Sequence, residues 1–280
     1  MTSSLPVLIV GSGKAGHFFS ALLAHRSPCI VSFRTTRIED WWPQEPSIVI
    51  LAIRDAGLRD MQNWSSDRSF PPGSAVFHCS GFLDNAPFEE ARKHSDASVS
   101  FGRMHPYHSI AGLPSPSKDT NVASCWIGVD GEDNAARIAY ELLLAAGAHT
   151  FPLKSVDATR YHASAAVLSN GAIALASIAE NLLASSGVKD KSLQSSLLAS
   201  ILRSVADNVQ AFGVTPSLSG PVRRGDLETV KRILASTPTG ALSLVRESLW
   251  VQADIAESLG EENPASFQAI RSMLKAPKLP

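Results

Sequence analysis

The chain has 280 residues, a formal net charge of −1, 44% hydrophobic residues and 18% charged residues. This composition is typical of a globular protein and excludes an intrinsically disordered chain. Because the net charge is close to zero, we expect neither nucleic acid nor a membrane surface as a partner. The length suits two domains of about 100–200 residues each.

The N-terminal segment Met1–Val10 has neither a basic start nor a small-residue cleavage site, so no signal peptide is predicted. Cys29, Cys79 and Cys125 are scattered, as expected of small buried residues in a reducing compartment, and we expect a cytoplasmic protein. The longest apolar stretch, Ala163–Ala179, is interrupted by serines, an asparagine and a glycine. It predicts a buried helix of a soluble protein and not a membrane span.

The first half of the chain alternates strand-like and helix-like segments. Continuous apolar runs such as residues 47–53 are typical of parallel strands that helices cover on both faces. The pattern therefore predicts an α/β fold with a doubly wound, mostly parallel sheet. The predicted strands are residues 5–10, 29–33, 47–53, 75–79, 99–103, 123–129 and 148–153. One predicted helix ends near residue 24, and another spans residues 134–146.

After residue 156 the strand signals disappear, and breaks that contain glycine or proline separate five apolar-periodic segments. These segments are residues 157–185, 191–212, 227–235, 241–259 and 264–274. We therefore expect an α/β domain in residues 1–154 and an all-helical C-terminal domain in residues 155–280.

A glycine-rich loop follows the first predicted strand directly and opens the first helix. Its sequence is Gly11-Ser12-Gly13-Lys14-Ala15-Gly16. In this context Gly11 permits a tight turn, Gly13 lets the backbone approach a pyrophosphate, and Gly16 lets the helix pack against the strand. Backbone N–H groups at the helix start would face the phosphates. The loop predicts a Rossmann domain that binds a dinucleotide, and the alternative is a glycine-rich turn without a ligand.

The end of the second predicted strand indicates which dinucleotide binds. NAD-binding domains usually carry Asp or Glu there, whereas residues 32–37 read SFRTTR. Arg34, with Thr35 or Arg37, would make charged hydrogen bonds to a 2′-phosphate. NADP is therefore the predicted cofactor, and solvated surface arginines are the alternative.

Further candidate residues follow other strands, because ligands of open α/β sheets bind outside the carboxyl ends of the strands. His78 and Ser80 lie at the end of the fourth strand and are expected to approach the nicotinamide or the substrate. A structural histidine in a Ser-Gly turn is the alternative. His105 follows the fifth strand as a candidate donor that orients the substrate. Ala52 and Ile53, at the end of the third strand, are assigned to the cofactor site. The histidine spacing matches no recognised ligand pattern, so no metal site is predicted.

The first helix of the second domain carries His162, Ser169, Asn170 and Gly171 in an apolar stretch. Glycine costs about 1 kcal/mol in a helix relative to alanine, and a buried asparagine needs hydrogen-bond partners. His162 and Ser169 lie nearly on one face, with Asn170 about 12 Å from His162 along the axis. We assign Asn170 to the nicotinamide or a substrate oxygen, Ser169 to the substrate site, and His162 to the other end of the substrate. A polar helix–helix contact is the alternative.

A tight turn, Ser219–Asp226, precedes the third predicted helix of this domain, and Asp226 is expected to be the N-cap of that helix. Arg223 or Arg224 in this turn would bind a substrate carboxylate. Alternatively, both arginines are surface charges or contact a partner subunit.

These motifs together resemble a bacterial family of two-domain Rossmann-like proteins whose C-terminal helical domain was long classed as of unknown function. The resemblance covers nearly the whole chain. That family is similar to a wider group with pyrroline-5-carboxylate reductase, ketopantoate reductase, prephenate dehydrogenase and the β-hydroxyacid dehydrogenases. The motifs are Gly11-x-Gly-x-x-Gly16, His78-x-Ser80-Gly81, His105-Pro106, Tyr161-His162-Ala163, Ser169-Asn170 and Ser219-Gly220-Pro221-Val222-x-Arg224-Gly225-Asp226.

The resemblance implies NADPH-dependent reduction of a carbonyl or imine in a small carboxylate substrate, such as the 2-oxo acid ketopantoate. It also implies a cleft between the domains and a homodimer built on the helical domain. The β-hydroxyacid dehydrogenases and ketopantoate reductases carry a catalytic lysine four residues before an asparagine of this helix. Asn170 matches that asparagine, but the place of the lysine is Ala166. A histidine, His162 or His105, would then protonate the product oxygen. Two other functions stay open: a non-catalytic NADP-binding sensor or scaffold, and hydride exchange between NADP and a second cofactor such as a deazaflavin.

Overall fold

The computed structural model describes residues 5–24, 31–34, 42–60, 68–84, 86–112, 125–260 and 264–275. The chain divides into an N-terminal unit, residues 1–169, and a C-terminal unit, residues 170–280. The boundary expected from the sequence, between residues 154 and 155, lies earlier than this division. Residues 155–169 belong to the N-terminal unit because side chains at the start of the first long helix pack against the sheet.

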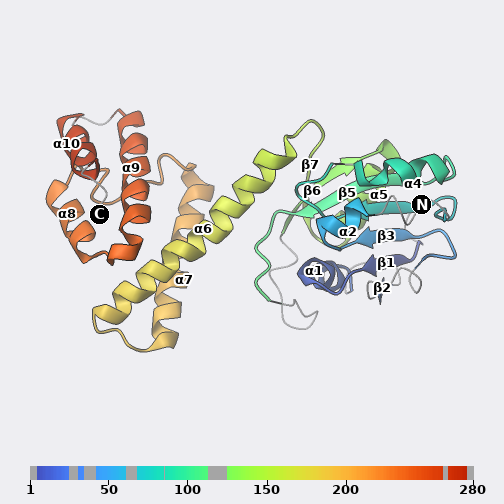
Figure 1. The fold of residues 1–280 in the computed structure, drawn as a ribbon, viewed down its shortest axis with the longest axis horizontal. Helices are drawn as coiled ribbons and strands as arrows, with labels where there is room; N and C mark the ends of the chain where they lie inside the picture. Colours follow the sequence, from blue (N-terminus) through green and yellow to red (C-terminus); the bar gives the residue numbers. More distant parts are fainter. Residues whose placement is uncertain are drawn as a thin grey trace. The chain divides into compact units, whose positions relative to one another are not determined.

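Within its described residues, the N-terminal unit holds a seven-stranded sheet in the order β2-β1-β3-β4-β5-β6-β7 (Figure 1). Neighbouring strands are parallel except β5 and β6, which pair antiparallel. The predicted doubly wound, mostly parallel sheet is thus confirmed. The strands are β1 (Val7–Val10), β2 (Val31–Arg34), β3 (Ile48–Leu51), β4 (Ala75–His78), β5 (Ser100–Pro106), β6 (Trp126–Gly131) and β7 (His149–Pro152).

Helices cover both faces of the sheet, because successive strand residues point to opposite sides. In β1, Val7 and Ile9 belong to one core, whereas Leu8 and Val10 belong to the core on the other face. The first core contains side chains of α1 and α5, and the second contains those of α2, η2 and α4. These helices are α1 (Lys14–Leu23), α2 (Asp55–Arg59), η2 (Ala86–Phe88), α4 (Glu89–His94) and α5 (Asp133–Ala145).

After β7, the regular elements of the described residues are helices, as predicted. α6 is a single helix that crosses the division between the two units. In the C-terminal unit, α8, α9 and α10 pack around a core that contains Val222, Val230, Leu249 and Ile270 (Figure 1). The helices are α6 (Ala158–Ser185), α7 (Lys191–Phe212), α8 (Leu227–Ser236), η4 (Thr239–Ala241), α9 (Leu242–Ser258) and α10 (Pro264–Leu274).

The prediction that the apolar stretch in α6 is buried is wrong. No residue of α6 is buried, and Val167, Leu168 and Ile173 are 74%, 70% and 65% exposed. By length and composition, α6 is also the one helix in the described part of the chain that could cross a membrane. The prediction failed because apolar periodicity shows that a face needs cover, but not whether the same chain provides it.

Candidate active site

The glycine loop takes the tight turn that the sequence predicts. Gly11 has a φ of 125°, and a Cβ placed on it would lie 2.2 Å from the carbonyl oxygen of Ala52. Only glycine fits a site with both a positive φ and this close backbone approach. The loop therefore lies directly against Ala52 and Ile53 at the end of β3. This is the point where the strand order reverses, where doubly wound sheets bind their ligands.

The start of α1 offers free backbone donors to an anion. Gly13 is the N-cap, no side chain caps the helix, and the first turn holds no acidic residue. Ser12, Gly13 and Lys14 are exposed, and nothing lies within 4 Å of a Cβ placed on Gly13. Gly16 is buried. An exposed helix N-terminus with unpaired N–H groups fits the phosphates of a dinucleotide.

The residues that would select the cofactor are described only in part. The backbone of Arg34 lies at the end of β2, opposite Val10 of β1. The Arg34 side chain, Thr35 and Arg37 lie outside the described residues. The preference for NADP therefore stays a prediction.

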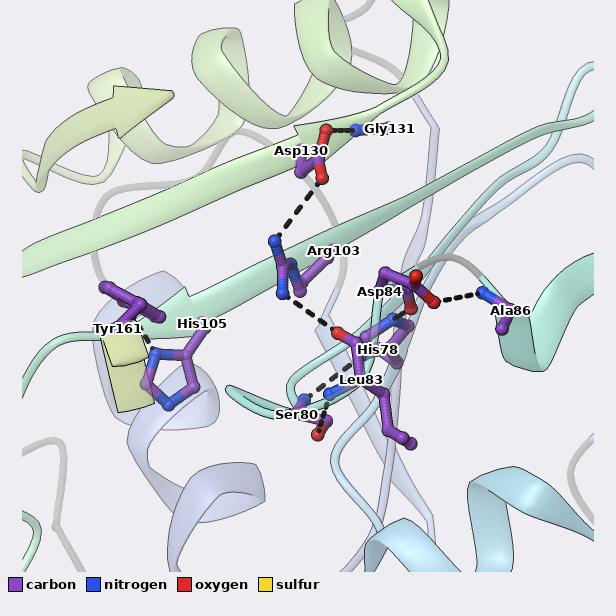
Figure 2. A network of polar contacts seen from close by, with 10 residues as sticks. All are labelled: His78, Ser80, Leu83, Asp84, Ala86, Arg103, His105, Asp130, Gly131 and Tyr161. Carbon is purple, nitrogen blue, oxygen red and sulfur yellow. Dashed lines mark hydrogen bonds and ion pairs between the residues drawn. The ribbon is translucent and has the colours of Figure 1, made fainter. Parts of the chain in front are cut away.

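His78 organises the turn that follows β4 (Figure 2). Its ring is fully buried, its Nε2 donates to the carbonyl oxygen of Asp84 at 2.7 Å, and its Nδ1 accepts from the Ser80 N–H at 3.2 Å. Burial lowers the pKa of His78 to about 4, so the ring is neutral at pH 7. With both nitrogens hydrogen-bonded and the ring buried, His78 holds the turn together in this conformation, and the contact with the nicotinamide or substrate that we expected of it stays a prediction.

Ser80 and Arg103 hold the same turn from two sides (Figure 2). The Ser80 Oγ accepts from the N–H groups of Phe82 and Leu83 at 3.1 and 3.0 Å, and Ser80 is buried. Arg103, 1% exposed, donates to the Leu83 carbonyl oxygen at 2.9 Å and pairs with Asp130 at 3.3 Å. These contacts fix the path of residues 78–83 at the carboxyl end of β4.

His105 and Tyr161 form a hydrogen-bonded pair in the N-terminal unit (Figure 2). His105 Nδ1 lies 2.8 Å from the Tyr161 hydroxyl oxygen. Burial lowers the pKa of His105 to about 4, assisted by the positive charges of His162 and Arg103. Burial also raises the pKa of the Tyr161 phenol. At pH 7 the pair therefore consists of a neutral imidazole and a protonated phenol.

His105 and His162 converge above Gly81. A Cβ placed on Gly81 would lie 2.6 Å from His105 Nε2 and 2.4 Å from His162 Nδ1. The two ring centroids are 5.7 Å apart, and Phe82 packs against the His162 ring at 4.7 Å. His162 Nδ1 is buried and has no hydrogen-bond partner among the described residues. Two imidazole nitrogens from different elements, β5 and α6, thus flank one point at the carboxyl ends of the strands.

The remaining predicted residues are not brought to this point by any contact in the structure. The Ser169 hydroxyl donates to the Ala165 carbonyl oxygen at 2.7 Å within α6, and Asn170 is exposed and belongs to the C-terminal unit. Arg223 donates to backbone carbonyl oxygens within its own turn, and Arg224 is exposed. The substrate contacts expected of these residues stay predictions.

Asp226 caps α8 as predicted. Its carboxylate accepts from the Thr229 N–H at 3.0 Å and from the Thr229 hydroxyl at 2.7 Å. These two bonds lower the pKa of the Asp226 carboxyl.

Three residues of the site were given no role by the sequence interpretation: Tyr161 and Gly81, which appear only within motifs, and Arg103. A signal existed for Arg103, because a charge in an otherwise apolar strand must find a partner when the strand is buried. Tyr161 precedes His162 directly, but a helical tyrosine next to a candidate residue is equally compatible with a packing role. Within the described chain, no group of three His, Cys, Asp or Glu side chains is placed to hold a metal ion.

Residues 125–248 match the model of a family described as "Domain of unknown function (DUF2520)". The matched stretch runs from β6 into α9, and so includes α6 with Tyr161 and His162. A search of curated proteins finds no match.

Solved structures with a similar fold cover nearly the whole chain. Protein TM1727 from Thermotoga maritima is 22% identical, with a TM-score of 0.61 over 91% of this chain and 100% of that one. Protein BF3122 from Bacteroides fragilis, provisionally named an NADP oxidoreductase, is 13% identical, with a TM-score of 0.66 over 94% and 100%. Pyrroline carboxylate reductase from Plasmodium falciparum, with NADP bound, is 12% identical, with a TM-score of 0.50 over 97% and 98%.

These comparisons confirm the resemblance drawn from the sequence motifs. The chain has the Rossmann-like fold with a helical C-terminal region that structures of NADP-dependent reductases share. At these identities the likeness establishes the fold, and the chemistry has to be argued from this chain's own residues.

Proposed function

We propose that the chain is an NADPH-dependent reductase that acts on a carbonyl or imine group of a small carboxylate substrate, such as a 2-oxo acid. The observation that carries this proposal is the convergence of His105 Nε2 and His162 Nδ1 above Gly81. They lie at the same edge of the sheet as the glycine loop. β1 and β5 are three strand spacings apart, about 14 Å. A dinucleotide on the loop would extend across the strand ends toward these histidines.

The glycine loop and the start of α1 would hold the cofactor. Backbone N–H groups near Gly13 would bind the pyrophosphate, and Arg34, with Thr35 and Arg37, would bind the 2′-phosphate of NADP. When bound, NADPH supplies the hydride for the substrate carbon. The Plasmodium falciparum structure with NADP bound, which has a similar fold, supports a nicotinamide cofactor.

The two histidines would have different roles. A general acid that works at neutral pH needs a pKa near 7, and burial lowers the pKa of His105 to about 4. We therefore assign protonation of the substrate oxygen to His162. His105 acts as a neutral hydrogen-bond donor that polarises the same oxygen, a role that neutral imidazoles can fill. The proton from His162 and the hydride together complete the reduction of a carbonyl to an alcohol.

The decisive experiment measures NADPH oxidation with a panel of ketopantoate, pyrroline-5-carboxylate and simple 2-oxo acids. We expect turnover of at least one of them, lost in His162→Ala and retained in His94→Ala, which removes an exposed histidine of α4. Titration with NADPH and NADH tests the cofactor, with NADPH expected to bind more tightly. Tight NADPH binding without oxidation across the panel would contradict the proposal and favour a sensor or scaffold.

The loop itself can be tested by Gly11→Ala. The new methyl group would overlap the Ala52 carbonyl oxygen, and alanine would be strained at a φ of 125°. We expect loss of NADPH binding in a fluorescence titration, together with a lower melting temperature. Wild-type affinity in this variant would show that the cofactor does not bind at the loop.

A further inference from the structure

Tyr161 makes a contact that the proposed reaction does not yet use. Its hydroxyl oxygen lies 2.8 Å from His105 Nδ1, and the two rings meet edge-on at 78° with centroids 5.3 Å apart. The other ring nitrogen, Nε2, faces Gly81 and His162. The direction of the Tyr161–Nδ1 hydrogen bond therefore determines whether the Nε2 that faces the site carries a hydrogen.

Aromatic packing holds the Tyr161 ring in place. Its centroid lies 5.5 Å from that of Tyr107 and 6.0 Å from that of Phe151 in β7. Its backbone N–H donates to the Asp157 carbonyl oxygen at 2.9 Å in the first turn of α6. The phenol is thus fixed by three elements, and its hydroxyl reaches one ring nitrogen.

We propose that Tyr161 is a positioning residue, which donates its hydroxyl hydrogen to His105 Nδ1 and so holds the imidazole in the tautomer with hydrogen on Nε2. This inference rests on the proposed function, because it supplies the N–H that His105 needs to bind a substrate oxygen. In the other tautomer Nε2 would be an acceptor, and would repel the oxygen that it has to polarise.

The direction proposed for this bond fits the chemistry of the two groups. A phenol O–H is a good donor, and a neutral imidazole offers one nitrogen as an acceptor. The titratable groups around the His105 ring are Tyr161 and His162 of α6, His78 of β4 and Arg103 of its own strand. The charge of Arg103 and that of a protonated His162 disfavour an imidazolium at His105. None of these groups is a carboxylate that could accept the phenol hydrogen in place of His105 Nδ1.

The direct test is ¹⁵N-edited NMR on protein with ¹⁵N-labelled histidine at pH 7, without cofactor or substrate. The eight histidines of the chain can be assigned by single substitutions, with His105→Asn identifying the resonances of interest. We expect the Nε2 of His105 to be protonated and its Nδ1 to be an acceptor. Protonation on Nδ1 in the wild-type protein would overturn the proposal, whatever the activity.

Tyr161→Phe and Tyr107→Phe form a matched pair, because each removes one hydroxyl from the same aromatic cluster. The Tyr107 hydroxyl bonds the Ser164 hydroxyl at 3.0 Å and not a ring nitrogen. We expect Tyr161→Phe to shift the tautomer of His105 and to lower kcat roughly 10–100-fold, as loss of an orienting partner does in other sites. Tyr107→Phe should change neither. An unchanged tautomer in Tyr161→Phe would contradict the proposal, whereas absent turnover in the wild type would contradict only the reductase function.

Discussion

Gly81 has no side chain at the point where the nitrogens of His105 and His162 converge. In Gly81→Ala the methyl group would lie within 2.6 Å of both nitrogens. We expect both rings to be displaced, at a cost of about 1–3 kcal/mol in the free energy of unfolding, as for other overpacked sites. NADPH oxidation should be lost, while NADPH still binds at the distant glycine loop.

A suitable control is Gly240→Ala, because nothing lies within 4 Å of a Cβ placed there. Both variants would be compared by urea unfolding, NADPH titration and turnover. Full activity in Gly81→Ala would show that the two histidines are not needed at their present separation.

The buried histidines make the stability of the fold sensitive to acid. Burial lowers the pKa of both His78 and His105 to about 4. The unfolded chain binds protons at these positions near pH 6.5, and the folded protein only near pH 4. The free energy of unfolding should therefore fall between pH 6.5 and pH 4, by up to about 1.4 kcal/mol per pH unit for each histidine. Above pH 6.5 these two residues should add no pH dependence.

Urea unfolding at pH 7.0, 6.0 and 5.0 measures this dependence. His78→Asn should lower the free energy of unfolding at every pH. It should also reduce the slope of that free energy against pH, below pH 6.5, by the share that one histidine contributes. Gly240→Ala, which changes no titratable group and meets no neighbouring atom, should leave the slope unchanged. Equal slopes in all three proteins would rule out a neutral, buried His78.

Between elements, Arg103 and Asp130 are directly opposite in the antiparallel pair β5–β6. Their ion pair is largely buried, with side-chain exposures of 2% and 18%. Arg103→Met would leave Asp130 unpaired and the Leu83 carbonyl oxygen without its donor. Removal of one partner of a buried pair costs about 3–5 kcal/mol, and we expect a loss of that order.

The double variant Arg103→Met/Asp130→Asn should recover part of this loss, because it also removes the unpaired charge. Chemical denaturation of the two single variants and the double variant gives the coupling energy. If the loss in the double variant equals the sum of the losses in the two single variants, the coupling energy is zero. The Arg103–Asp130 ion pair would then add nothing to the free energy of unfolding.

The elements of the fold could be read from the sequence where periodicity is strong. The predicted helices 191–212 and 264–274 agree with α7 and α10. The short helices α2 and α4 were missed, because five or six residues are too few to show a period. The glycine loop was found because its residues are contiguous. The His105–Tyr161 pair joins residues 56 positions apart, a contact that no local pattern encodes.

For the whole molecule, the exposed apolar side chains of α6 and α7 need cover. α7 has one buried residue, Gln194, and its large apolar residues share one half of the helix surface. They include Leu193, Leu197, Ile201, Leu202, Val205, Val209 and Phe212, which are 37–66% exposed. We propose that a second copy of this chain covers them, in a soluble homodimer built on the helical region. Lipid is a poor alternative, because serines, two asparagines and a glutamate interrupt α6.

Light scattering on the purified chain should therefore give the mass of a dimer, twice 29.8 kDa. Ile201→Asp places a charge in the middle of the apolar half of α7, and should yield monomers. Arg203→Ala lies on the opposite half of the same helix and should stay dimeric. A monomeric wild-type protein at micromolar concentration would contradict the proposed dimer.

The reversed direction of β6 and β7 has a consequence for the order of folding. β6, α5 and β7 occupy the continuous stretch 126–152, so their contacts are local and close only short loops. His105 and His162 lie on the two sides of this stretch in sequence. We expect this segment to gain protection from hydrogen exchange early in refolding. β5, which carries His105, pairs with β6, and α6, which carries His162, begins shortly after β7. We therefore expect the two histidines to come together before β1 and its glycine loop join the sheet.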